Sequence, residues 1–292
     1  MELQRDPATR PFRFGVYMSN VTSRKDLIAK CQRAEDLGYD VIGVADHLDM
    51  WAPFPAVMLA AEVTERPKVA TTVLNAAFYN PSLLARDVMA AHRLTDERLE
   101  LGLGTGYMRS EFDACGLAWP AAPQRVDHLE RSIAEIRRRF AGPNGIPRPP
   151  LWVTGRGDRV LRIAAREAEI IGLTGFAPGN DGHKGDLANA DGLAERVAYV
   201  RAHLGKRSSR VELNVLVWRV MVTTNRIAAA SNLGPARSLT PDELLNVPTV
   251  LIGTPMQIGE QLVEFRERFG FSYITVRDYF LDEFAPVIAY LR

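Results

Sequence analysis

Asp46 and His47 are adjacent residues whose side chains suit acid–base chemistry. They directly follow the apolar segment 41–45, so they stand where a predicted strand ends. A histidine beside an acidic residue can accept or donate a proton near neutral pH. The alternative is a structural histidine that ties a loop to the rim of the fold. We predict Asp46 and His47 as catalytic residues and leave the structural role open.

Three glycines at alternate positions, Gly102, Gly104 and Gly106, end another apolar segment. Alternate glycines remove side chains from one face of a strand end, so a flat molecule can lie against the backbone. A bulged strand end without a ligand is the alternative. The spacing differs from the G-x-G-x-x-G dinucleotide fingerprint, because residues 108–110 stand where a third glycine would be. We interpret this strand end as the floor of a cofactor pocket.

A third candidate is the anion-binding segment formed by Gly155, Arg156 and Gly157, which precedes a predicted helix. The free N–H groups and the dipole at a helix start attract negative charge. Arg156 and Arg159 add positive charge to this segment. A plain glycine turn with exposed arginines remains the alternative.

Short apolar segments that alternate with helical patterns must position these residues. The apolar segments do not alternate regularly between polar and apolar residues, which is typical of strands buried on both faces of a parallel sheet. Eight such units in 292 residues favour an α/β fold, a single-domain (β/α)8 TIM barrel with inserted loops at its carboxyl-terminal face, where active sites form. The predicted strands are residues 12–18, 41–45, 69–74, 98–104, 151–154, 170–174, 213–222 and 273–276.

Helix signals support this alternation. Gly38 is expected to end the first helix, which the periodicity predicts over residues 23–37. Asn80-Pro81, Thr240-Pro241 and Thr254-Pro255 each place a capping residue before a proline at the first helical position. We therefore expect helices to begin at these three places.

Composition limits the classes of function. The chain is 47% hydrophobic and 24% charged with a net charge of +1, so no broad electric field favours nucleic acid or a membrane surface. Cys31 and Cys115 suit a reducing cytoplasm, where we expect the protein. We expect residues 1–11 to form a flexible tail and the barrel to span 12–292. No histidine pair has metal-ligand spacing, so no metal site is predicted.

The sequence resembles the luciferase-like monooxygenase superfamily, and within it the oxidoreductases that use the deazaflavin coenzyme F420. The resemblance extends over most of the chain from Phe12 onward. Its motifs are A-E-D-L-G-Y-D at 34–40, V-A-D-H at 44–47, T-T-V-L at 71–74, R-L-E-L-G-L-G-T-G-Y at 98–107 and L-I-G-T-P at 251–255.

The resemblance implies a barrel with a flavin-like ring lying across the strand ends. It implies a cis peptide bond between Thr72 and Val73 that supports the ring. It places the phosphate of the coenzyme at Gly155 and Arg156, and a pocket-facing strand end at Thr174. Ring, ribityl or substrate contacts are implied for Asp46, His47, Asn75, Thr105, Gly106 and Ser110.

Two departures separate the chain from the sugar-phosphate dehydrogenases of this family. Those relatives carry an acidic residue after the first strand, where Met18, Ser19 and Asn20 stand here. They carry another acidic residue after the glycine motif, where this chain has Tyr107. Both differences argue against the sugar-phosphate reaction.

Three functions follow as hypotheses. The first is hydride transfer between coenzyme F420 and a small organic substrate, with His47 supplying a proton. The second is an FMN-dependent monooxygenase using FMNH2 and oxygen, with a dry pocket lined by aromatic residues. The third is a non-catalytic barrel that acts as a binding or partner subunit. The aromatic candidates for the dry pocket of the second hypothesis are Tyr17, Trp51, Phe54, Phe78, Tyr79 and Trp218.

The resemblance also implies a homodimer through the helices beside strands two and three. Met58, Leu59 and Met89 on these helices face either a partner or the barrel. The loops 47–56, 107–125 and 177–190 are expected to shape the substrate pocket. Within the last loop, Lys184 is a further candidate for the acidic tail of the coenzyme.

Overall fold

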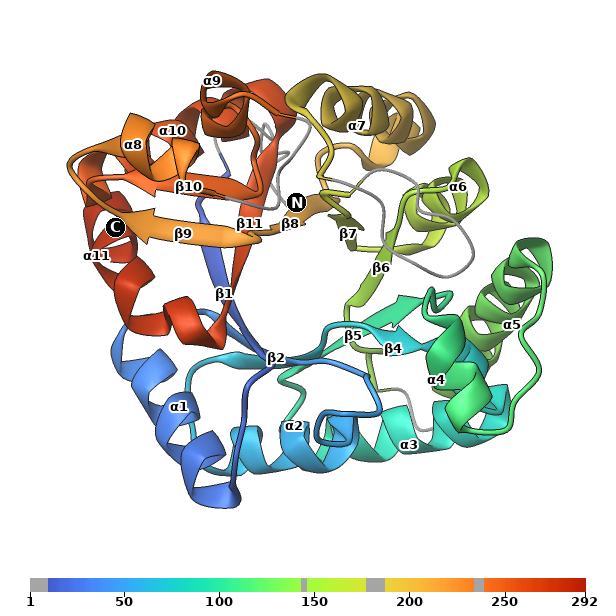
Figure 1. Cartoon of the computed structure of the whole chain (residues 1–292). Coiled ribbons are helices and arrows are strands. Elements are labelled where there is room, and N and C mark those ends of the chain that lie inside the picture. Colours follow the sequence, from blue (N-terminus) through green and yellow to red (C-terminus); the bar gives the residue numbers. More distant parts are fainter. Residues whose placement is uncertain (1–9, 143–145, 177–186, 234–238) are drawn as a thin grey trace.

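Parallel strands form a closed barrel surrounded by helices in the computed structural model (Figure 1). The structure describes residues 10–142, 146–176, 187–233 and 239–292. Each neighbouring pair of barrel strands is parallel, and pairing of β3 with β5 closes the ring. The predicted (β/α)8 barrel is therefore confirmed. Its strands are β1 (Arg13–Met18), β2 (Val41–Val44), β3 (Lys68–Thr71) continued by β4 (Leu74–Asn75), β5 (Leu99–Gly104), β6 (Leu151–Gly155), β7 (Ile170–Leu173), β8 (Glu212–Leu216) and β11 (Phe271–Arg277).

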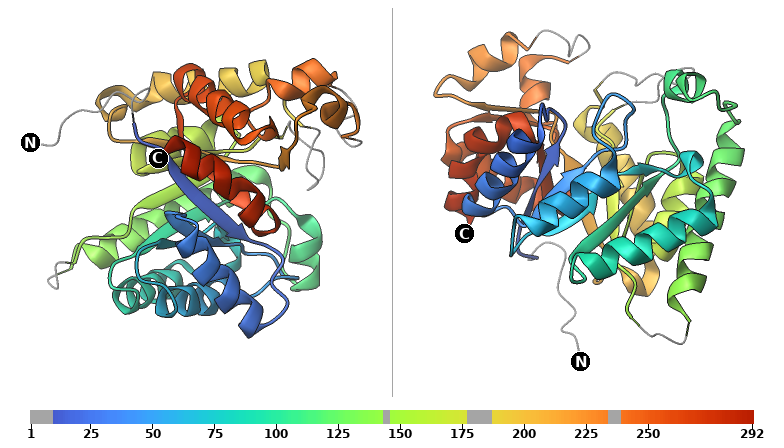
Figure 2. Two further views of the ribbon diagram at one scale, coloured as in Figure 1. Left: turned by 90° about the vertical axis from the view of Figure 1, so that its left-hand side faces the viewer. Right: turned by 90° about the horizontal axis from the view of Figure 1, so that it is seen from below.

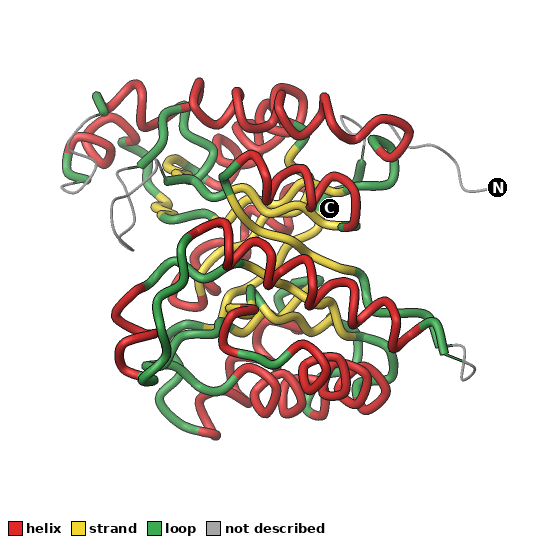
Figure 3. The backbone as a smooth tube through the Cα atoms, turned by 90° about the vertical axis from the view of Figure 1, so that its right-hand side faces the viewer, coloured by secondary structure: helices red, strands yellow, loops and turns green. Residues whose placement is uncertain are grey.

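The helices lie outside the strands, as Figures 2 and 3 show. Their apolar faces and the outer faces of the strands form the main hydrophobic core. Buried Leu27, Cys31 and Ala34 of the first helix are an example. The surrounding helices are α1 (Arg24–Asp36), α2 (Pro53–Glu62), α3 (Pro81–Leu94), α5 (Ala122–Phe140), α6 (Asp158–Glu167), α7 (Ala190–Leu204), α10 (Pro255–Phe269) and α11 (Leu281–Leu291).

The predicted helix signals are confirmed. Asn80 caps α3 by accepting hydrogen bonds from the backbone of Ser82 and Leu83. Thr240 and Thr254 form capping boxes at the starts of α9 (Pro241–Leu245) and α10. Gly38 has a φ of +84° directly after α1, a conformation that favours glycine. Short 3-10 turns complete the connections: η2 (Ala76–Phe78), η3 (Gly205–Arg207) and η4 (Asp278–Phe280).

Polar and aromatic side chains fill the amino-terminal end of the barrel. Arg13 donates hydrogen bonds to the buried carboxylates of Glu100 and Glu212. The guanidinium also lies over the ring of Tyr273, 4.6 Å from its centroid, and Tyr273 packs against Trp152. This plug separates the two ends of the barrel, so the interior is open toward the carboxyl ends of the strands.

The third barrel strand is interrupted where the resemblance places the cis bond. The peptide between Thr72 and Val73 is cis, and β3 and β4 lie on either side of it. The expected single strand over residues 69–74 is thus two short segments. Both pair with β5.

The predicted strand over residues 213–222 is wrong as one element. Its first half is β8 of the barrel, whereas β9 (Arg219–Val222) leaves the barrel and pairs with β10 (Val250–Gly253). With α8 (Arg226–Ser231) and α9, these strands form an insertion beside the barrel (Figure 1) that has its own small core. Continuous apolar character indicates burial but does not reveal that a chain changes its pairing partner.

A short helix, α4 (Arg109–Ala114), follows the glycine motif and was not predicted. It is too short to show a helical period in the sequence. The tail expected over residues 1–11 and the loop with Lys184 lie largely or wholly outside the described residues. In the described part of the chain, helices long and apolar enough to cross a membrane are absent.

Candidate active site

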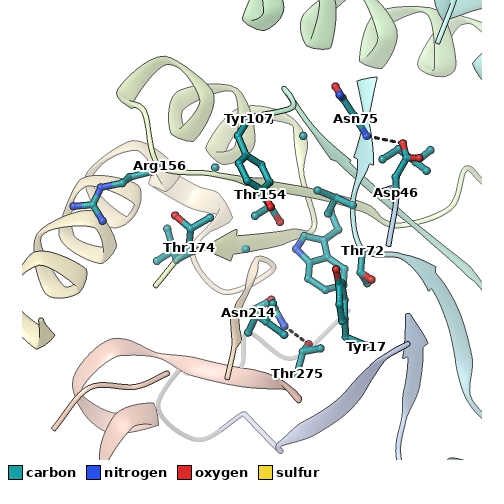
Figure 4. Close-up of a pocket in the computed structure, with 18 of the residues that line it drawn as sticks. Tyr17, Asp46, Thr72, Asn75, Tyr107, Thr154, Arg156, Thr174, Asn214 and Thr275 are labelled. Carbon is teal, nitrogen blue, oxygen red and sulfur yellow. Dashed lines mark hydrogen bonds between the residues drawn. The ribbon is translucent and has the colours of Figure 1, made fainter. Parts of the chain in front are cut away.

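A cavity of about 370 Å3 opens at the carboxyl ends of the barrel strands (Figure 4). Each strand of the barrel, or the loop that follows it, contributes residues to the cavity wall. Two predicted residues do not line the cavity: Ser110 on α4 and Gly157 at the N-cap of α6. The other predicted site residues do line it: Asp46, His47, Thr72, Val73, Asn75, Gly104, Thr105, Gly106, Gly155, Arg156 and Thr174.

The acidic partner of His47 is Glu111 and not Asp46. The Nδ1 atom of His47 lies 2.7 Å from Oε1 of Glu111, and both residues line the cavity. The ring of Tyr107 packs edge-on against His47 with 6.0 Å between centroids. Sequence reasoning did not identify Glu111 as the partner of His47, because the two residues are 64 positions apart and Glu111 lies in the unpredicted helix α4.

Asp46 instead fixes the strand end that carries Asn75. Its Oδ2 accepts the backbone N–H of Asn75 at 2.9 Å, and the Tyr79 hydroxyl is a second hydrogen-bond partner. Burial raises the pKa of Asp46, although the Asn75 hydrogen bond acts in the opposite direction. Adjacent residues on the strand end thus have separate partners.

The alternate glycines also make room for the protein's own chain, a role that was not predicted. A Cβ atom on Gly102 would lie 2.0 Å from the carbonyl oxygen of Thr71. One on Gly104 would lie 3.0 Å from Val73, and one on Gly106 would lie 2.3 Å from the amide oxygen of Asn75. The glycines therefore make room for residues 71–75. Gly104 and Gly106 also line the cavity.

Five polar side-chain atoms on the cavity wall are buried without a hydrogen-bond partner among the described residues. An unsatisfied buried polar group costs about 1–3 kcal/mol, so this wall is suited to a polar ligand. The five atoms are Thr72 Oγ1, Asn75 Nδ2, Trp152 Nε1, Thr154 Oγ1 and Arg277 Nε.

Trp152 and Thr154 were not predicted as site residues. They stand two apart on β6, so both side chains point to the same face of the strand. Alternation along the predicted strand 151–154 is the signal that could have found them. Asn214 and Thr275 also line the cavity, where the Asn214 amide donates to the Thr275 hydroxyl at 2.8 Å (Figure 4).

Arg156 lies on the opposite side of the cavity from Tyr17 (Figure 4). One guanidinium nitrogen donates to the carbonyl oxygen of Phe176 at 2.8 Å. The adjacent N-cap of α6, Gly157, has no side chain to cap the helix start. Free N–H groups at this turn and the Arg156 cation suit an anionic group.

Arg159 does not contribute to this anion-binding end. Its guanidinium binds Asp127 at 2.6 Å and Glu130 at 2.7 Å on α5. Two carboxylates therefore compensate the charge that was expected to attract the coenzyme. Arg156 precedes the N-cap Gly157 and lies outside the helix, whereas Arg159 lies in the first turn of α6 and binds acids of α5.

Tyr17, Trp218 and Arg277 also line the cavity. Burial raises the pKa of Tyr17 well above its ordinary value, so its hydroxyl stays neutral. Four of the aromatic candidates for a dry pocket lie outside the cavity wall: Trp51, Phe54, Phe78 and Tyr79.

Groups of three or more potential metal ligands are absent from the described residues. Cys31 is buried, and burial raises the pKa of its thiol to about 12. Cys115 is exposed and does not line the cavity. The acid–base groups at the cavity are thus carboxylates, the imidazole of His47 and tyrosine hydroxyls.

Comparison with known families agrees with this barrel and its cavity. The family model described as luciferase-like monooxygenase matches residues 10–272 of the chain. The chain belongs to the luciferase-like monooxygenase family. A curated relative is the F420-dependent glucose-6-phosphate dehydrogenase of Amycolatopsis mediterranei, which is 33% identical over 129 residues. That match covers 41% of this chain and 39% of the relative, so it spans about two-fifths of the relative's length.

Solved structures share the fold. An F420-dependent secondary alcohol dehydrogenase in complex with an F420-acetone adduct superposes with a TM-score of 0.74 and 17% identity. The superposition covers 97% of this chain and 100% of that one. The monooxygenase RslO1 from Streptomyces bottropensis gives a TM-score of 0.70 and 16% identity, covering 95% of this chain and 96% of that one.

Proposed function

We propose that this protein is an oxidoreductase that transfers a hydride between coenzyme F420 and a small organic substrate. The observation that carries the proposal is the set of unpartnered buried polar atoms on the cavity wall, next to an anion-binding helix start. A polar planar ring with an acidic tail would satisfy both features. Curated relatives named as F420-dependent enzymes support this coenzyme over others.

Residues on one side of the cavity would hold the coenzyme. Thr72, Asn75 and Thr154 would offer hydrogen bonds to its ring, and Val73 and the backbone from Gly104 to Gly106 would lie beside it. Arg156 and the start of α6 would bind its anionic tail. When bound, the coenzyme supplies a carbon centre that exchanges two electrons as hydride.

His47 would exchange a proton with the substrate on the other side of the cavity. Its ring lines the cavity and is held through Nδ1. Asp46 would act by holding Asn75 in place. Tyr17 and Trp218 would orient the substrate and exclude water from the reacting atoms.

Equilibrium binding tests the proposal. Oxidised coenzyme F420 and FMN are titrated separately into the protein, and the change in coenzyme fluorescence is recorded. We expect saturable binding of F420 at micromolar concentration or below and much weaker binding of FMN. Tight FMN binding without F420 binding would defeat the proposal.

An FMN-dependent monooxygenase is the second candidate, because solved monooxygenases share the fold. Oxygen uptake that depends on reduced FMN would favour it. A non-catalytic barrel is the third candidate. Once a substrate is known, unchanged turnover in His47→Ala would remove the catalytic assignment of His47.

We also propose a homodimer through α2 and α3. Met58, Leu59 and Met89 pack only in part against the core, and Leu83 on α3 is exposed. Sedimentation equilibrium of the full chain tests this proposal, with a monomer at all concentrations as the contrary result.

A further inference from the structure

Glu111 is a cavity-lining acid for which the proposed reaction provides no role. We infer that Glu111 is a positioning residue that holds His47 in the tautomer with the proton on Nδ1. The other ring nitrogen, Nε2, then acts as the hydrogen-bond acceptor toward the cavity. The role of Glu111 in catalysis rests on the proposed function. The tautomer of His47 does not depend on that function.

The contact geometry supports this assignment. Oε1 of Glu111 lies 2.7 Å from Nδ1 of His47 and 3.4 Å from the backbone nitrogen of Leu48. Glu111 is only 8% exposed, and His47 is largely buried. One carboxylate oxygen thus faces two nitrogen atoms from the loop that follows β2. Such an arrangement fixes the loop as well as the ring.

The tautomer follows from hydrogen-bond chemistry. A carboxylate oxygen accepts hydrogen bonds, so the nitrogen that faces it must carry the proton. A neutral imidazole has one N–H group, so Nε2 is left with its lone pair. A carboxylate on Nδ1 also fixes the plane of the ring. The edge of Tyr107 limits rotation of the ring further.

Nitrogen-15 NMR of the histidine rings tests the inference without coenzyme or substrate. The spectra are recorded at about pH 8, where an ordinary imidazole is neutral, and His47 is assigned by comparison with His47→Gln. In the wild type we expect the Nδ1-protonated pattern for His47. An Nε2-protonated pattern would overturn the inference.

Three variants distinguish the effect of the Glu111–His47 hydrogen bond from the effect of the negative charge on Glu111. Glu111→Gln retains an acceptor oxygen and should keep the Nδ1–H pattern, whereas Glu111→Leu should lose it. Asp113→Asn is the matched control on the same helix, because Asp113 is exposed and pairs with Arg109; it should match the wild type. An unchanged pattern in Glu111→Leu would also overturn the inference.

Coenzyme binding distinguishes failure of the inference from failure of the proposed function. Titration of F420 into the wild type and Glu111→Gln should give the same affinity within about twofold. Absence of F420 binding to the wild type would defeat the proposed function and leave the tautomer result standing. A loss of affinity greater than tenfold in Glu111→Gln would instead make Glu111 a coenzyme ligand and contradict its positioning role.

Discussion

Asp46 shows how a single buried carboxyl group links the cavity to the stability of the fold. It accepts the backbone N–H of Asn75, the residue that follows the cis peptide segment. Burial raises its pKa above the ordinary value of 3.8. Ionisation of Asp46 is therefore less favourable in the folded protein than in the unfolded chain.

The raised pKa predicts a pH-dependent effect of Asp46→Asn. The stability that wild-type Asp46 contributes is complete below pH 3.8 and falls as the pH rises through its pKa in the folded state. The stability of Asp46→Asn relative to the wild type should therefore increase with pH over that interval. Urea denaturation of both proteins at a series of pH values measures this difference. A difference that stays constant or falls with pH would contradict the assignment.

Arg156 and Arg159 provide a matched test of the anion-binding end. Arg156→Gln should weaken F420 binding by about tenfold or more, because a charge-assisted hydrogen bond contributes about 1.5–3 kcal/mol. Arg159→Gln removes the same charge from a side chain that already binds Asp127 and Glu130. It should leave the affinity within about twofold of the wild type. Isothermal titration calorimetry of both variants measures the effects, and equal losses would exclude a specific role for Arg156.

Residue-level prediction succeeded where a residue's local sequence determines its place. Asp46 and His47 end a strand, so their position at the cavity follows from the barrel alone. The partner of His47 could not be predicted, because Glu111 comes from a different loop. Adjacency in sequence suggested Asp46 as the partner, but successive side chains diverge at a strand end.

At the level of elements, the strand β5 is packed against the segment that follows β3. Its glycines allow the backbone of residues 71–73 to approach closely. This contact determines where Thr72 and Asn75 lie on the cavity wall. The resemblance implied the cis bond, whereas the reason for the glycines required the structure.

Gly102→Ala tests this packing. The added methyl group would lie 2.0 Å from the Thr71 carbonyl oxygen and 2.7 Å from Val73, so the free energy of unfolding should fall by about 3 kcal/mol or more. Gly142→Ala is the control, because among the described residues its methyl group would meet only the Arg139 carbonyl, at an ordinary 3.5 Å. The free energy of unfolding of Gly142→Ala should stay within about 0.5 kcal/mol of the wild-type value. Chemical denaturation measures both, and a tolerated Gly102→Ala would show that the segment can move.

Elements with strong local signals were the predictable ones. Capped helices such as α3 and α10 begin at the expected residues. The short strands β9 and β10 could not be predicted as a separate sheet, because four-residue apolar segments do not reveal their partners. The insertion that they form places Trp218 at the cavity, a consequence of tertiary pairing.

At the scale of the whole molecule, the ion cluster at the amino-terminal end closes the barrel interior. Arg13 connects β1 with the buried acids of β5 and β8, which are distant in sequence. Glu100 and Glu212 share the single cation of Arg13, so the burial of both carboxylates depends on that cation. The plug also defines the depth of the cavity at the other end.

Arg13→Met should destabilise the barrel by about 3–5 kcal/mol, because it leaves two buried carboxylates without their cation. Replacing Glu100 and Glu212 by glutamine in the same protein should recover much of this loss. Thermal and urea unfolding measure both variants. A loss below about 1 kcal/mol in Arg13→Met would indicate that water compensates the acids.

A crystal structure of the protein with coenzyme F420 tests the central claim most directly. We predict ring density in the cavity, within hydrogen-bonding distance of Thr72, Asn75 or Thr154, with the acidic tail at Arg156 and the start of α6. Coenzyme density elsewhere on the protein, or a cavity filled by the chain's own side chains in the presence of saturating F420, would contradict the claim.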